Sequence, residues 1–124
     1  MQNYRQLAVW QKGHAIAVQI HILTESIPRN RNAGIVSQMR RAAQSIPANI
    51  VEGSSRSGDR DFAKFVQIAI GSASELEYHL HFAGAVALIS KSECEERQRD
   101  VVAVRRMLIA LLKRLRTAEQ SAPR

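Results

Sequence analysis

SQMRRAAQSIPANIVEG, residues 37–53, combines a helical pattern with residues that interrupt it. Its apolar residues recur three and four positions apart, which is the spacing that places them on one buried face of a helix. Pro47 lies inside this pattern, removes one backbone donor and crowds an earlier carbonyl group, so we expect a kink near Pro47. Gly53 is expected to end the helix in a left-handed conformation. The stretch therefore predicts a kinked helix from about residue 35 to residue 52, packed against other helices.

Three further segments show helical periodicity. Residues 7–26 carry an apolar stripe that ends before Pro28, residues 61–88 carry the longest stripe, and the last helix opens with Ser90-Lys91-Ser92-Glu93, the pattern of a capping box, and runs to about residue 117. The segments between the helices, 29–34 and 53–59, are short polar loops, and we expect Ser57 or Asp59 to cap the third helix. We therefore predict an all-α protein, an antiparallel up-and-down four-helix bundle. It forms one domain, residues 1–119, followed by a disordered tail at 120–124.

Three segments of the chain resemble one known family: LAVWQKG at 7–13, SQMRRAAQSIPANIVEG at 37–53 and GSASELEYHL at 71–80. They are similar to the four-helix-bundle family of the 23S-rRNA intervening-sequence proteins, which also includes the accessory proteins of diversity-generating retroelements. The resemblance covers about residues 4–88, and Gly13 and Val51 stand where alanine is expected. It implies a small bundle that assembles as a ring-like homo-oligomer, a pentamer. It also implies contacts with nucleic acid or with a reverse transcriptase, and no catalysis.

The positive charge of the chain is concentrated towards its carboxyl end. The chain has 18 basic and 11 acidic residues, a net charge of +7. Residues 97–124 contain eight basic and two acidic residues, whereas residues 1–96 contain ten and nine. Such a surface fits a polyanion bound through its phosphate groups, and it equally fits a basic face that only keeps the protein in solution. The candidate nucleic-acid contacts share or flank one face of the last helix; they are Arg99, Arg105, Arg106, Lys113 and Arg116.

A second group of candidate residues is apolar and lies on the outer faces of the last two helices. Ile68, Tyr78 and Phe82 lie opposite the core face of the third helix, and Val102 and Ile109 widen the apolar arc of the fourth. Exposed apolar patches mark protein contacts. We therefore expect these residues at the interface of a homo-oligomer, unless loops or the amino-terminal residues cover the two aromatic rings. A protein-interaction scaffold with no role in nucleic-acid binding is the alternative function.

Polar residues of the family-like segments form a third group. Charged groups near a core are tolerated when they are paired and hydrogen-bonded. We predict a structural polar cluster in which Arg40 or Arg41 pairs with Glu75 or Glu52 and joins the second helix to the third. We also expect Asn49 and Glu52 to turn inward and form hydrogen bonds.

The sequence has no pattern of a catalytic or metal site. Di-iron bundles use Glu-x-x-His, but Glu75 and Glu77 have the wrong spacing to His79. The glycines at the ends of 53–58 have the spacing of a phosphate loop, but the required lysine is missing. Acidic neighbours disfavour the thiolate of Cys94, the only cysteine. We therefore predict a protein that is not an enzyme and has no metal or other cofactor.

The sequence also predicts where the protein is found. The amino-terminal MQNYRQLAVW has no apolar signal core. No apolar run reaches the ~18 residues of a membrane span. A single cysteine fits a reducing compartment. We therefore expect a cytoplasmic protein without a membrane partner.

Overall fold

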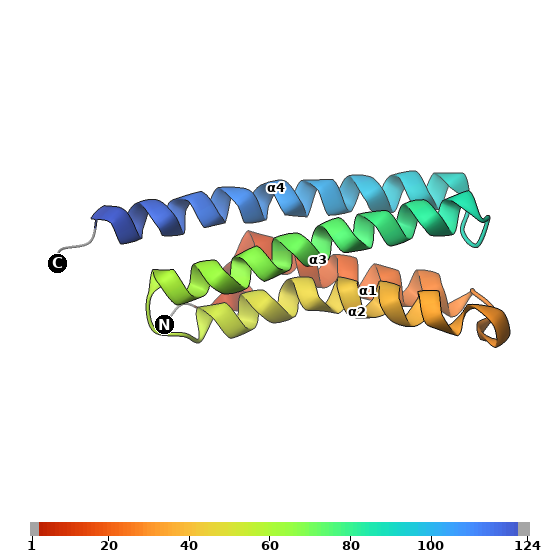
Figure 1. Ribbon diagram of the computed structural model, residues 1–124, viewed down its shortest axis with the longest axis horizontal. Coiled ribbons are helices and arrows are strands. Elements are labelled where there is room, and N and C mark those ends of the chain that lie inside the picture. The colour runs from red at the N-terminus through yellow and green to blue at the C-terminus, as the bar shows by residue number, and fades with distance from the viewer. Residues whose placement is uncertain (1–2, 122–124) are drawn as a thin grey trace.

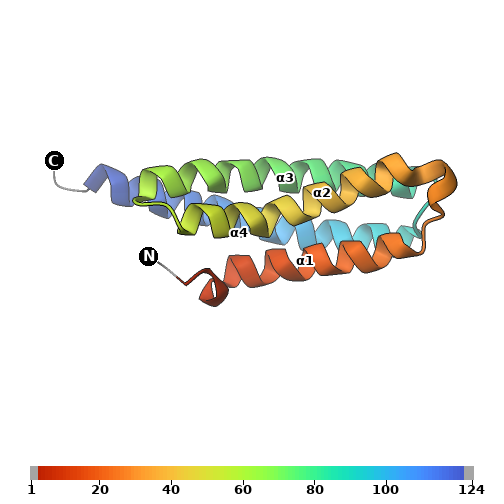
Figure 2. The same ribbon diagram turned by 90° about the horizontal axis from the view of Figure 1, so that it is seen from below.

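The computed structural model describes residues 3–121, with side chains to residue 118, and consists of long helices. A short 3-10 turn comes first, and the elements are η1 (Tyr4–Gln6), α1 (Ala8–Glu25), α2 (Arg29–Ser54), α3 (Asp59–Ala85) and α4 (Lys91–Ser121). Successive helices run antiparallel (Figures 1 and 2). The α1–α2 and α3–α4 turns lie at one end of the molecule, and the α2–α3 turn lies at the other. The predicted all-α four-helix bundle is confirmed.

The core is formed by the apolar side chains that recur at helical spacing. All four helices contribute side chains that are fully buried, among them Ile20, Met39, Ile46, Leu76 and Leu108. The helices are arranged around the core in chain order, so that α2 packs on α1 and α3, and α4 packs on α3 and more lightly on α1. Burial of this apolar surface is the main force that holds the helices together. The arrangement leaves α2 and α4 on opposite sides of the bundle.

The start of α2 differs from the prediction. Residues 29–34, expected as a surface loop, form the first turns of the helix after Pro28, whose dihedral angles are extended. Asn32 lies inside these turns with non-helical angles, φ −123° and ψ 16°. Its Nδ2 donates a hydrogen bond to the carbonyl oxygen of Pro28 at 2.8 Å. The non-helical angles of Asn32 produce a kink between a first turn after Pro28 and the rest of α2, and its side chain bonds the carbonyl group that precedes the kink.

Two interruptions of α2 were expected, a kink near Pro47 and the end of the helix at Gly53. Pro47 is buried in α2 and keeps helical dihedral angles, so the kink near Pro47 stays a prediction. The helix continues through Gly53 to Ser54, and among the described glycines the positive φ belongs to Gly58. A Cβ atom on Gly53 would lie 2.7 Å from Cδ1 of Phe62 in α3. The prediction that Gly53 ends the helix is therefore wrong, and glycine is needed at this position for the close approach of α2 to α3.

The ends of α3 and α4 show one prediction right and one wrong. The cap of α3 is Gly58, and no side chain caps the helix, so neither Ser57 nor Asp59 has the predicted role. Before α4, the Oγ of Ser90 accepts a hydrogen bond from the backbone N–H of Glu93 at 3.0 Å, as the capping-box pattern predicts. The last turns of α4 extend past the start of α3 (Figure 1). Residues 120 and 121 of the predicted tail are helical, and residues 122–124 lie outside the described part.

Candidate nucleic-acid and partner-binding surfaces

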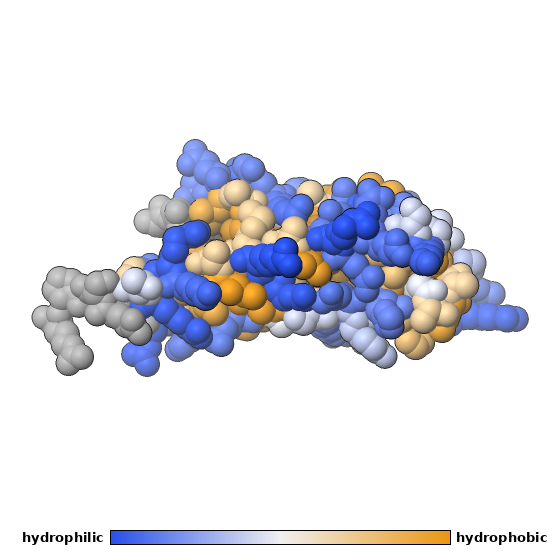
Figure 3. Space-filling model, turned by 90° about the horizontal axis from the view of Figure 1, so that it is seen from above, coloured by the Kyte–Doolittle hydropathy of each residue, from blue (hydrophilic) through white to orange (hydrophobic). Residues whose placement is uncertain are grey.

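An outward strip on α4 alternates basic and apolar side chains. Its members lie three and four positions apart, which places them on one face of the helix. Figure 3 views the molecule from the α4 side and shows hydrophilic side chains with hydrophobic patches between them. All the members are exposed except Val102, which is half-buried. Predicted nucleic-acid contacts and predicted interface residues thus share one surface, the α4 strip, which comprises Arg99, Val102, Arg106, Ile109, Lys113 and Arg116.

Arg105 lies beside this strip and has a different role. Its Nη1 donates a hydrogen bond to Oε1 of Glu77 in α3 at 2.5 Å, and both side chains are half-buried. A charge-assisted hydrogen bond of this kind is stronger than one between neutral groups. Arg105 therefore holds α4 against α3. Its role as a nucleic-acid contact stays a prediction, and the pairing with Glu77 makes Arg105 a weaker candidate than the exposed members of the strip.

Among the residues with described side chains, carboxylates lie beside the basic residues of the amino-terminal half of α4. Arg97 forms ion pairs with three carboxylates of its own helix. Arg99 lines a shallow depression of about 570 Å³ that also contains the carboxylates of Glu77 and Glu95. Residues 105–118, in contrast, include five basic and no acidic residues. Apart from Arg105, these basic residues form no ion pair with a described carboxylate, and they lie around Lys113.

The apolar side chains on the outer face of α3 are open to solvent. Tyr78 is 60% exposed, Ile68 52% and Phe82 43%, and Val86 extends the patch at 50%. The rings of Tyr78 and Phe82 lie 6.5 Å apart between centroids. The described loops and amino-terminal residues therefore do not cover these rings. We call these four residues the α3 patch; a cluster of large apolar side chains on one helix face is typical of a protein contact.

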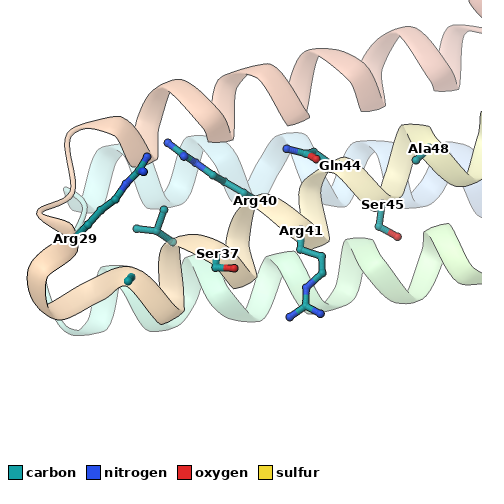
Figure 4. Close-up of a pocket in the computed structure, with 9 residues that line it drawn as sticks. Arg29, Ser37, Arg40, Arg41, Gln44, Ser45 and Ala48 are labelled. Carbon is teal, nitrogen blue, oxygen red and sulfur yellow. The ribbon is translucent and has the colours of Figure 1, made fainter.

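The predicted ion pair between α2 and α3 is not formed, because Arg40 points to α1. Its Nε donates a hydrogen bond to Oγ1 of Thr24 at 2.7 Å, and its Nη2 donates to the carbonyl oxygen of His21 at 3.2 Å. Thr24 is fully buried in the last turn of α1, where the carbonyl end of the helix attracts a cation. Arg41 extends on the other side of α2, towards α3 (Figure 4). It forms no ion pair with a described carboxylate.

The acidic members of the predicted cluster are surface residues. Glu52 and Glu75 are exposed, and each pairs with a basic residue one turn further along its own helix. Hydroxyl groups join α2 to α3 instead, since the Oγ atoms of Ser45 and Ser72 lie 2.7 Å apart. Nδ2 of Asn49, which is half-buried, donates to the Oγ of Ser45 at 2.9 Å. Asn49 therefore turns inward as expected, whereas the inward turn predicted for Glu52 is wrong.

The surroundings of the cysteine disfavour its thiolate form. Cys94 is buried, and its Sγ donates to the carbonyl oxygen of Leu80 at 3.2 Å. Burial, and to a lesser degree the charge of Glu95, raises the pKa of the Cys94 thiol. The thiol therefore stays protonated near neutral pH. In the described part of the chain, no three potential metal ligands lie together, and no helix has the length and apolar character needed to cross a membrane.

A solved structure and a protein-family model both match this chain. A solved structure of a protein with unknown function from the S23 ribosomal protein family of Bacteroides thetaiotaomicron VPI-5482 is 26% identical and superposes with a TM-score of 0.76. The alignment covers 86% of this chain and 99% of that chain. No curated protein matches the chain. The model of the 23S rRNA-intervening sequence protein family matches residues 5–110, which includes the first part of α4. The chain therefore belongs to the 23S rRNA-intervening sequence protein family.

Proposed function

We propose that this protein is a non-enzymatic, homo-oligomeric helical bundle that binds nucleic acid with the carboxyl-terminal half of the α4 strip. The observation that carries the proposal is the exposure of Arg106, Lys113 and Arg116 in a segment, residues 105–118, that has no acidic residue. Cations of this kind bind phosphate groups and release counterions, which gives affinity without sequence readout. The strip has no aromatic side chain on which a base would stack, so unrelated sequences should bind alike.

Assembly of several chains strengthens such a surface. A few cations on one chain give a modest affinity for a polyanion. Copies held together in a ring engage one nucleic-acid molecule at a high effective concentration. The family resemblance implies five chains, so light scattering at micromolar concentration should give about five times the 13.9 kDa mass of the chain, as a closed ring requires. A monomer would contradict this part of the proposal.

The test of nucleic-acid binding is the salt dependence of affinity, measured by the fluorescence anisotropy of labelled single-stranded RNA and DNA. Arg106, Lys113 and Arg116 are replaced by glutamine, and a control with the same net charge replaces Lys12, Lys64 and Lys91. Loss of three phosphate contacts should lower the salt slope by about 2, at about 0.7 per contact with a single strand. The control variant should keep the slope of the wild type. If the wild type binds neither RNA nor DNA at low salt, the proposal is wrong.

The α3 patch supports a second candidate, a protein-interaction scaffold without a role in nucleic-acid binding. Its four apolar side chains are between 43% and 60% exposed, and nothing in the nucleic-acid proposal uses them. Tyr78→Glu places a charge in the patch without touching the core, so it should lower the mass measured by light scattering while the helical circular dichroism is retained. The scaffold would be favoured by two results together. The wild type would bind RNA no more tightly than an unrelated basic protein does, and Tyr78→Glu would dissociate the oligomer.

A further inference from the structure

A shallow depression of about 620 Å³ runs along the outer face of α2, and arginines line it (Figure 4). Small side chains also line it, with Ser37 between Arg29 and Arg40 and Ala48 beyond Arg41, so a ligand can approach the helix backbone closely. The polar residues of this surface are regularly spaced along the helix. We call it the α2 groove; its polar lining comprises Arg29, Ser37, Arg40, Arg41, Gln44 and Ser45.

The charge of the α2 groove is unbalanced. Three arginines line it, and its described lining contains no carboxylate. The depression beside the α4 strip is different, because there two arginines, Arg99 and Arg106, face two glutamates. Residues 26–51 contain four arginines and no acidic residue. The near-neutral total of residues 1–96 conceals this segment, because the acidic residues of that part of the chain lie outside it.

The three arginines are arranged on both sides of the groove. Arg29 and Arg40 extend on the α1 side of α2, and Arg41 extends on the α3 side (Figure 4). The hydrogen bonds of Arg40 to Thr24 and to the backbone of α1 fix its guanidinium group. They use two of its five N–H donors and leave three. Arg29 and Arg41 are exposed and form no ion pair with a described carboxylate. One guanidinium group held by α1 and two exposed ones thus line the same depression.

We propose that the α2 groove binds the phosphate backbone of a nucleic-acid strand. Guanidinium groups match phosphate oxygens with paired hydrogen bonds, and Ser37 and Gln44 supply further polar groups, whereas the hydroxyl of Ser45 is already bonded to Ser72 and Asn49. A protein partner is the weaker match, because tight protein interfaces are centred on large buried anchors. The groove offers small side chains and charges, and Val36 is already buried in the core.

The groove is a separate surface from the α4 strip. The backbones of the two helices are not in contact and lie on opposite sides of the bundle, with α2 in front of α4 when the molecule is seen from below (Figure 2). One chain therefore presents two cationic faces. The inference on the α2 groove does not depend on binding by the α4 strip, and the two are tested with separate variants.

The experiment measures anisotropy of a short labelled single-stranded RNA over a range of salt concentrations. The test variant is Arg29→Gln with Arg41→Gln, since both side chains are exposed; Arg40 is left unchanged because its contacts with α1 support the fold. The matched control is Lys64→Gln with Lys91→Gln, which removes the same charge from other exposed sites. The loss of two phosphate contacts should lower the slope of log affinity against log salt concentration by about 1.4. Raising the salt from about 50 to 200 mM should therefore weaken the test variant by a factor about sevenfold smaller than the factor for the wild type.

The outcomes separate the two proposals. A flattened slope for the test variant with an unchanged control supports the α2 groove, whether or not the α4 variant changes. A test variant that binds like the wild type overturns the α2 groove, even if the α4 variant loses binding, and leaves the groove to an acidic protein partner. An equal loss in test and control variants also overturns it, because binding then depends only on net charge. Inorganic phosphate serves as a competitor of the labelled RNA. If phosphate alone displaces the RNA at millimolar concentration, the proposed nucleic-acid strand is wrong and the groove binds a small phosphorylated ligand.

Discussion

Gly53→Ala tests the closest contact between two helices of the bundle. An added Cβ atom would lie 2.7 Å from Cδ1 of Phe62, 3.2 Å from its Cε1 and 2.9 Å from Cβ of Phe65. Phe62 is buried, so its ring has little room to move. The Cβ of Phe65 is fixed to the backbone of α3 and moves only if the helix moves. The substitution therefore forces α2 and α3 apart near the turn that joins them.

The expected loss of stability is the difference between two opposing effects. Alanine is favoured over glycine inside a helix by about 1 kcal/mol, which stabilises the variant. An extra methyl group in a well-packed core costs about 1–3 kcal/mol, and the immobile neighbours of Gly53 place the cost near the upper end. The free energy of unfolding should therefore fall by about 2 kcal/mol. For a chain of this length, about 3–5 °C per kcal/mol gives a melting temperature lower by about 6–10 °C.

Thermal and urea unfolding followed by circular dichroism at fixed protein concentration measure this loss. The matched control is Gly71→Ala, because Gly71 lies on the exposed face of α3 and a Cβ there meets no atom within 4 Å. The control should melt slightly higher than the wild type, since only the helix-propensity gain remains. If Gly53→Ala gains stability as Gly71→Ala does, the close approach of α2 to α3 at this point is wrong.

The remaining predictions concern α4. Arg105→Gln should lower the free energy of unfolding by about 1 kcal/mol through the lost contact with Glu77, but it should leave the salt slope of RNA binding unchanged. Arg106→Gln should do the reverse in the same unfolding and anisotropy measurements. Ile109→Glu should weaken RNA binding at unchanged mass if the α4 strip contacts nucleic acid, and should lower the light-scattering mass if the strip contacts another chain. Because the pKa of Cys94 is raised in the folded protein, the thiol of the unfolded chain ionises at a lower pH than the folded thiol. The free energy of unfolding should therefore fall as the pH rises above 9.0, the ordinary pKa of a cysteine thiol. Cys94→Ala should flatten this fall, measured by urea unfolding at several pH values.

The helices and the core were predictable because they depend on local periodicity. Residues such as Ile46, Leu76 and Leu108 recur at the helical period and are buried whatever the neighbouring helix is. The ends of the helices were less predictable, because they depend on single hydrogen bonds. Residues 29–34, expected as a loop, contain a helical turn followed by a kink at Asn32, whose side chain bonds the carbonyl oxygen of Pro28. The Oγ of Ser90, by contrast, forms the bond its pattern predicts.

Side-chain partners could not be predicted from the sequence, because they depend on which helices lie side by side and at what height. The sequence predicts that Arg40 or Arg41 joins α2 to α3, but Arg40 lies on the α1 side of α2 and contacts Thr24, sixteen residues earlier, and Arg41 pairs with no described carboxylate. Arg105 looked like one more cation of the last helix until α3 placed Glu77 beside it. The α2 groove was missed for another reason: charge was counted over long segments, whereas residues 26–51 without any acidic residue were a visible signal.

The two halves of the α4 strip suit different partners. Around Arg99 the depression contains Glu95 as well as Glu77, which is paired with Arg105, and the neighbouring Val102 is half-buried, so a protein surface covering this half would meet charges of both signs beside an apolar side chain. Around Lys113 no carboxylate is available in residues 105–118, so a protein surface there would have to supply its own acidic groups, whereas phosphate groups supply them in every nucleotide. Ile109 lies between the halves, 38% exposed, which is why its replacement by glutamate distinguishes the two uses. A subunit contact on the amino-terminal half would leave both the carboxyl-terminal half and the α2 groove open, so assembly and binding to a polyanion are compatible in one molecule.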